Sequence, residues 1–535
     1  MRPASSLHAV ALPAAPQRPQ LWWPLLLVAA VAWLVRIAGF FHRGGAFGYP
    51  VDYDEGVYFS AAALLSHGVW PYRDYFFVHP PGIAVLLAPV AALSHGFDAA
   101  VAFSVVRWLV PGLGALSALL SGRIVQERWG TRAGVVAALV YALYPEATAA
   151  ERGPFLEPLL NLTCLTAAWV WLRPGEEWRR DVWAGALLAT ACAIKLTAGA
   201  WVLAAILARG ATGEGRRVLR VVGVAAGVGL LWLGPFFVLA PDAMLEGLLR
   251  FQLLRPPDGE LDVWRRLLAA VGEHHVGVSV LGVMGLLIAL ARIRQREAVA
   301  ERLFATAWLL TLATFLSSKS YWVQYNAQLA ASQAVLAGLG ASWVLGVAER
   351  RSRTAFALVA LAVGVAALSP LSAVIESARQ KDRGLLALGN TLRASVPPDA
   401  ALCTFEPGWA IAAGRLPGVP RGAPALVDSY GLMLHDALGG PERFTHASAA
   451  FENERSQRAW CFPCSRAATS SSSTGGVSGS SPRPASAGWR STSPEMGSYG
   501  DAGARSPRAY CGRRMASGQY PNATQGTDLS SSRNP

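Results

Sequence analysis

Apolar runs of membrane-spanning length recur along the first 375 residues, and they constrain the fold more than any other feature of the chain. A bilayer core needs about 20 apolar residues for each crossing helix. The run at 182–208 is long and carries Lys195 midway, so we expect two helices that meet there. The predicted fold class is mainly α, a polytopic membrane bundle of about eleven helices, with runs at 21–41, 100–122, 133–150, 154–172, 182–208, 221–240, 276–291, 303–316, 327–348 and 354–375.

Arginine-rich loops alternate with these runs and predict the orientation of the chain. Cytoplasmic loops of membrane proteins carry an excess of basic residues. The loops expected on that side contain Arg123, Arg128 and Arg132; Arg173, Arg179 and Arg180; Arg209, Arg216 and Arg217; Arg292, Arg294 and Arg296; and Arg350, Arg351 and Arg353. The segments between them, including 42–99 and the vicinity of Lys195, are then expected on the non-cytoplasmic face of the inner or plasma membrane.

Composition divides the chain into four parts. We expect a cytoplasmic segment at 1–20, a membrane domain at 21–375, a small external domain at 376–454 and a disordered low-complexity tail at 455–535. Within the membrane domain, 42–99 form a long first external loop with short amphipathic helices at 56–67 and 82–95. The tail is rich in Ser, Gly, Pro and Arg, without hydrophobic period. Its composition is the one expected of an out-of-frame translation of a GC-rich gene.

The basic charge does not indicate nucleic acid, and the sequence predicts no metal or cofactor. The net charge of +13 comes largely from short loops and the tail, and no basic face with interleaved aromatic residues is visible. Cys461 and Cys464 have no second pair at zinc-finger spacing. Phosphate-binding glycine loops, nucleophile elbows and zinc-protease motifs are missing from the sequence.

A tight cluster of carboxylates follows the first apolar run: Asp52, Asp54 and Glu55. The simple interpretation is a solvated external loop. A carboxylate cluster between two apolar stretches nevertheless needs a partner or a role, and this favours a functional site. One such carboxylate can act as a general base that accepts a proton from an attacking hydroxyl.

Other charged residues are predicted on the same face. Glu157 lies about one turn inside an apolar run, so it must pair or line a cavity; a structural ion pair with Arg152 or Lys195 is the alternative to a catalytic role. His79 precedes the rigid Pro80-Pro81 pair, and its alternative is an ordinary interfacial histidine. Lys195 and Lys319 also fall at outer ends of helices. Cations there suit a phosphate-bearing lipid headgroup, whereas snorkelling of lysine to the interface is the alternative.

The stretch DEGVYFSAAALLSHGVWPYRDYFFVHPPG, residues 54–82, resembles the membrane glycosyltransferases of the GT-C class. The likeness is above all to the bacterial branch shared by protein O-mannosyltransferases and lipid A aminoarabinose transferases. In that branch an acidic pair follows the first helix, and a basic residue with Pro-Pro follows some two dozen positions later. ERGPFLEP at 151–158 and AIKLTAG at 193–199 resemble its later motifs. The branch often has lysine in place of His79 and aspartate in place of Glu157, so the sugar and the lipid donor stay open.

The resemblance implies an enzyme that transfers a hexosyl or pentosyl group from a polyprenyl-phosphate donor, with inversion, on the non-cytoplasmic face. The acceptor would be a lipid, a glycan or a protein. Asp54 would be the general base, and Glu55 and Glu157 would orient the reacting groups. His79, Arg152, Lys195 and, from its predicted position, Lys319 would hold the donor phosphate. Two alternatives remain: a transporter or flippase of a polar lipid or glycan, and a non-catalytic assembly protein of the cell envelope.

Overall fold

The computed structural model describes residues 21–42, 52–259, 261–379, 385–397, 402, 404–417, 425–438 and single positions between 444 and 449. The predicted N-terminal segment at 1–20 and the predicted tail at 455–535 lie outside the described residues. The chain divides into two compact units, and all described residues lie in the first of them, residues 1–467. The boundary of an external domain at 376 therefore stays a prediction.

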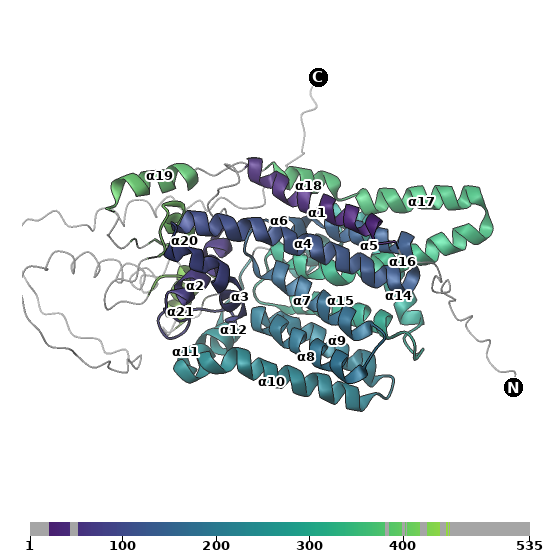
Figure 1. Cartoon of the computed structure of the whole chain (residues 1–535), viewed down its shortest axis with the longest axis horizontal. Helices are drawn as coiled ribbons and strands as arrows, with labels where there is room; N and C mark the ends of the chain where they lie inside the picture. The colour runs from purple at the N-terminus through teal and green to yellow at the C-terminus, as the bar shows by residue number, and fades with distance from the viewer. Residues whose placement is uncertain are drawn as a thin grey trace, which may run out of the picture. The chain divides into compact units, whose positions relative to one another are not determined.

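Helices occupy every apolar run that the sequence predicts (Figure 1). Six described segments are long and apolar enough to span a membrane, or seven if the bent pair of α13 (Val263–Val271) and α14 counts as one. The polytopic helix bundle is thus confirmed, while the number of eleven crossings stays a prediction. The bundle consists of α1 (Trp23–His42), α4 (Ala99–Trp129), α5 (Thr131–Ala142), α6 (Pro145–Ala150), α7 (Leu156–Leu172), α8 (Glu177–Ile194), α9 (Gly199–Gly210), α10 (Gly215–Leu239), α14 (Val276–Ala291), α15 (Val299–Ser317), α16 (Ala330–Arg351) and α17 (Arg353–Leu368).

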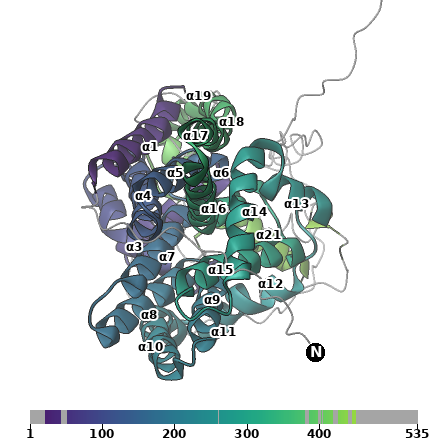
Figure 2. The same ribbon diagram turned by 90° about the vertical axis from the view of Figure 1, so that its right-hand side faces the viewer.

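Close backbone packing holds the centre of the bundle. α16 lies between α5 and α14 and contacts both (Figure 2). A Cβ atom on Gly285 of α14 would overlap the carbonyl oxygen of Leu336 on α16, and one on Gly340 would overlap that of Leu281. Small residues let membrane helices approach this closely. At the periphery, α10 buries only 11% of its most apolar window, so its Leu and Val side chains have lipid as their solvent.

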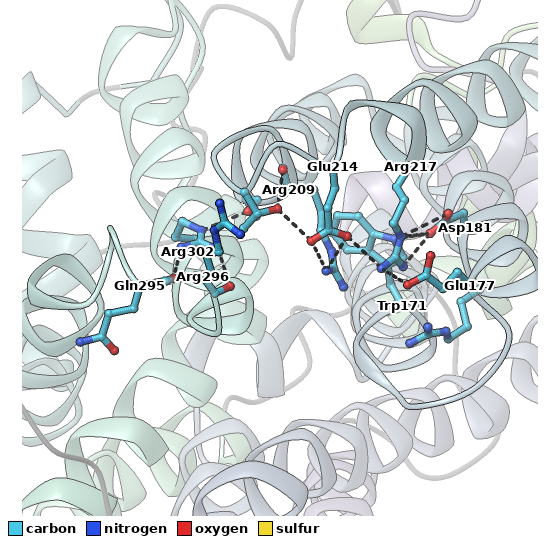
Figure 3. A network of polar contacts seen from close by, with 12 residues as sticks. Trp171, Glu177, Asp181, Arg209, Glu214, Arg217, Gln295, Arg296 and Arg302 are labelled. Atoms are coloured by element: carbon cyan, nitrogen blue, oxygen red, sulfur yellow. Dashed lines mark hydrogen bonds and ion pairs between the residues drawn. The ribbon is translucent and has the colours of Figure 1, made fainter.

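The five arginine-rich loops gather at one end of the bundle. Arg128 donates to the Leu172 carbonyl at 2.7 Å, and Arg132 pairs with Glu349 at 3.2 Å. The remaining links form the network in Figure 3. There Asp181 accepts from Arg217 at 2.9 Å and from Arg220 at 2.7 Å, and Arg302 donates to the Ala208 and Gln295 carbonyls. The arginine-rich loops, which the alternating pattern predicts on one side of the membrane, therefore do lie at one end of the bundle. That this end is cytoplasmic stays a prediction.

The opposite end is built from shorter helices, with α2, α20 and α21 at the left of Figure 1, away from the α16–α17 turn at the right. Its elements are α2 (Tyr53–Ser66), α3 (Gly82–Ala91), α11 (Pro241–Leu245), α12 (Phe251–Leu254), α18 (Leu371–Ala378), α19 (Leu385–Ser395), α20 (Pro407–Ala412) and α21 (Ser429–Leu438). Helices do form at 56–67 and 82–95. However, α2 is not an amphipathic surface helix, because all residues from Glu55 to Leu64 are buried. Its Phe59 packs edge-on against Phe103 of α4, and its Gly56 meets the backbone of Gly408 in α20.

The long run at 182–208 is broken at Lys195, as the sequence predicts. α8 ends at Ile194, and α9 begins at Gly199 after a short 3-10 turn. Lys195 has an extended backbone with φ −150° and ψ 127°, which no α-helix can continue through. The break places the lysine side chain at the end of a helix rather than in the middle of one.

Candidate active site

The acidic cluster folds into the first turn of α2, where two of its three members have structural roles. The Asp52 side chain accepts from the Asp54 N–H at 3.0 Å, and the Asp52 N–H donates to Glu55 Oε2 at 3.1 Å. These bonds form a capping box, which satisfies amide groups that the helix leaves unpaired. Glu55 is 2% exposed and lies against Gly153, where a Cβ atom would overlap its carboxylate. The arrangement leaves Asp54 as the acid without a capping function.

Asp54 presents a carboxylate that makes no hydrogen bond or ion pair with the described residues, and the residue is partly exposed. Burial raises its pKa well above the ordinary aspartate value, and the neighbouring charge of Asp52 raises it further. Glu157 and Asp428 act in the same direction, and Lys195 opposes them. A carboxylate held among other carboxylates is a stronger base than an isolated one.

Glu157 and Lys195 form an ion pair next to Asp54. Lys195 Nζ lies 2.6 Å from Glu157 Oε1, and their side chains are 12% and 4% exposed. The ammonium also lies 4.0 Å from the centre of the Tyr325 ring, in the 3-10 segment η5 (Val323–Leu329). Of the two pairings that the sequence allowed for Glu157, the structure shows the one with Lys195. Arg152 instead donates to Ser377 of α18 at 2.9 Å.

His79 lies near Lys195 but does not carry the positive charge expected of a phosphate-binding cation. Its Nε2 is 3.4 Å from the Tyr58 hydroxyl, and its carbonyl accepts from Tyr72. Burial lowers the pKa of its imidazole to about 3, and the nearby charges of Lys195 and Arg255 act in the same direction. The imidazole is therefore neutral at physiological pH and can only exchange hydrogen bonds.

Arg255 is a cation of this site that the sequence reasoning missed. It is 9% exposed, and its Nη2 lies 2.6 Å from Asp258 Oδ2. Its Nε is buried without a hydrogen-bond partner among the described residues. Arg255 precedes Pro256-Pro257, as His79 precedes Pro80-Pro81. This repeated pattern of a basic residue before two prolines was the signal available in the sequence.

Lys319 lies on a segment that is hydrogen-bonded to the segment carrying Arg255, and it does not join the Lys195 pair. Its Nζ is exposed and donates to the Leu253 carbonyl at 3.0 Å. Its own carbonyl accepts from the Asp258 N–H at 2.8 Å. The described residues contain no grouping of three or more His, Cys, Asp or Glu side chains suited to a metal ion.

Comparisons with known proteins support the fold through structure and not through sequence. No family model and no curated protein sequence matches the chain. The crystal structure of ArnT from Cupriavidus metallidurans bound to undecaprenyl phosphate matches with a TM-score of 0.57 and 16% identity, over 74% of this chain and 85% of that one. An oligosaccharyltransferase from Archaeoglobus fulgidus, tethered with an acceptor peptide, matches with a TM-score of 0.55 and 15% identity, over 83% and 68%.

Together with the apolar helices, these likenesses identify a multi-pass membrane protein. Sequence identity this low establishes fold and leaves function to the chemistry of the site. The chain therefore has the fold of the GT-C membrane glycosyltransferases.

Proposed function

We propose that the protein is a membrane glycosyltransferase that takes a sugar from a polyprenyl-phosphate donor and transfers it, with inversion, to an acceptor on the non-cytoplasmic face. Structures of this fold support the lipid ligand: ArnT is bound to undecaprenyl phosphate, and an A. fulgidus oligosaccharyltransferase is in complex with a dolichol-phosphate. Nucleotide sugars are cytoplasmic, so a transfer site on the outer face needs a donor carried across the membrane on lipid.

The observation that carries the proposal is the environment of Asp54. Its carboxylate has no hydrogen bond or ion pair with the described residues, while burial and neighbouring acids raise its pKa. A cap or a structural ion pair would instead engage the oxygens and favour the ionised form. Such a carboxylate suits a general base that awaits a hydroxyl.

The chemistry is a single displacement at the anomeric carbon. Asp54 accepts the proton of the acceptor hydroxyl as the acceptor oxygen forms its bond to that carbon. The bond between the anomeric carbon and the phosphate oxygen breaks, and the electron pair leaves with the polyprenyl phosphate. Direct displacement inverts the configuration of the sugar.

Cations must stabilise the departing phosphate, and we assign this role to Lys195 and Arg255. The ammonium of Lys195 is partly neutralised by Glu157, whereas the Nε–H group of Arg255 can still donate a hydrogen bond. His79 contributes a hydrogen bond from its neutral ring. Arg152, held by Ser377, and Lys319, on the segment hydrogen-bonded to that of Arg255, would support the site from outside it.

The test compares Asp54→Asn with Asp52→Asn in purified protein reconstituted into nanodiscs. The probes are a panel of undecaprenyl-phosphate-linked hexoses and pentoses, with an envelope fraction as acceptor, and the readout is release of undecaprenyl phosphate. Loss of a general base is expected to slow transfer by about 10²- to 10⁴-fold in Asp54→Asn. Asp52→Asn keeps a good helix cap and is expected to retain transfer at pH values above the acid limb of the rate profile. Full activity of Asp54→Asn, or no consumption of any donor by the wild-type protein, would contradict the proposal.

A further inference from the structure

A segment near the C-terminal end of the described chain lies against the first turn of α2, which carries Asp54. Residues 425–430, which we call the C-terminal strap, comprise the segment before α21 and the first two residues of that helix, and they are buried from Ala425 to Ser429. The Asp428 carboxylate in this strap is 4% exposed. A buried acid this close to Asp54 requires an explanation, because removing a carboxylate from water costs free energy unless hydrogen-bond donors or a cation compensate it.

The strap is hydrogen-bonded to Tyr53, the residue directly before Asp54. Asp428 Oδ1 accepts from the Tyr53 hydroxyl at 3.2 Å and from the Gly431 N–H at 2.9 Å. The Tyr53 hydroxyl in turn accepts from the Tyr430 N–H at 2.8 Å. Tyr53 and Tyr430 also pack ring against ring, with 6.4 Å between their centres. These contacts fix the side chain of Tyr53, and through it the backbone of the first turn of α2.

The strap also contributes charge. The groups that act on the Asp54 carboxyl are Asp52 at the helix cap, Glu157 of α7, Lys195 at the end of α8 and Asp428 of the strap. Tyr53 and Tyr58 of α2 and Tyr325 of η5 are further titratable side chains that interact with Asp54. Asp428 lies 375 residues beyond Tyr53 in the sequence, in a part of the chain that no catalytic motif covers.

We propose that Asp428 is a positioning residue for Asp54: it holds the first turn of α2 through Tyr53 and places a second buried carboxylate near the base. This inference rests on the proposed function and extends it to the C-terminal strap. The strap completes the site, and a chain without it would keep the membrane bundle but present Asp54 loosely and as a weaker base.

The test separates the two effects by substitution and by pH. Asp428→Asn is expected to lower kcat on the order of tenfold to a hundredfold, because small displacements of catalytic groups cost up to about 100-fold. It is also expected to move the acid limb of the kcat profile to lower pH, because one negative charge near Asp54 is gone. Tyr53→Phe is expected to lower kcat with the acid limb in place. Asp436→Asn on α21 is the control, since its carboxylate pairs with His435, and it should change neither quantity.

Donor consumption by the nanodisc-reconstituted protein, with the fastest sugar of the panel, gives both readouts. Wild-type rate and an unmoved acid limb in Asp428→Asn would overturn the inference while leaving the proposed function intact. Loss of the function itself would appear separately, as a wild-type protein that consumes no donor. If Asp428→Asn does not reach the membrane folded, Tyr53→Phe decides: a wild-type kcat in that variant overturns the positioning role.

Discussion

The ion pair between Lys195 and Glu157 yields a prediction whose magnitude follows from its burial. Replacing Lys195 by Met leaves the Glu157 carboxylate, 4% exposed, without the partner that now lies 2.6 Å away. Breaking one side of a buried pair costs about 3–5 kcal/mol, because the remaining charge keeps its desolvation penalty. Loss of the contact with the Tyr325 ring at 4.0 Å adds about 0.5–2 kcal/mol. The ratio of folded to unfolded protein should fall by at least about two orders of magnitude.

A double-mutant cycle tests the cause of this loss. Removing both charges, in Lys195→Met with Glu157→Gln, leaves no ion unpaired, so most of the stability should return. Unfolding in mixed detergent micelles, followed by tryptophan fluorescence, gives the free energy of each variant. The restored double variant should still bind undecaprenyl phosphate more weakly than the wild type, since Lys195 is assigned to the phosphate. A loss under about 1 kcal/mol in Lys195→Met, or a double variant as unstable as the single one, would refute the reasoning.

Three further substitutions test other parts of the site. Asp52→Asn removes a charge that raises the pKa of Asp54, so the acid limb of transfer should move to lower pH; an unchanged limb would contradict the assigned electrostatics. Arg255→Lys keeps the charge but loses the planar guanidinium, and undecaprenyl phosphate should bind about 10- to 100-fold more weakly by titration. Gly153→Ala forces a methyl group onto Glu55 and should cost about 1–3 kcal/mol in the same unfolding assay, whereas Gly364→Ala, which meets open space, should not destabilise.

The bundle was predictable from the sequence because the length of each apolar run and the arginine-rich loops between the runs can be recognised from neighbouring residues alone. Each apolar run contains a helix, and the break at Lys195 follows from a charged residue in an overlong run. The surface position of α2 was predicted wrongly. Its residues 56–67 are apolar enough for a membrane interface, but both α3 and α20 pack on the helix. Because α20 is far away in the sequence, local periodicity carries no information about such a partner.

The candidate site was predictable only where its residues stand in motifs. Asp54, Glu157 and Lys195 come together as their motifs implied. Arg255 and Asp428 were missed, because the roles we propose for them depend on proximity in space between distant segments. The neutral state of His79 was also missed: it depends on burial and on two nearby cations, neither of which a sequence displays.

The most direct test of the whole account is the side of the membrane on which the α2–α4 region lies. Gly96, in open space between α3 and α4, is replaced by cysteine in a background whose native cysteines are changed to serine. Gly215, the first residue of α10 and likewise in open space, serves as the matched site at the arginine-rich end. In intact cells a membrane-impermeant maleimide should label the cysteine at position 96 and not the one at position 215. Labelling at 215 with protection at 96 would place Asp54 inside the cell and contradict a lipid-carried sugar donor.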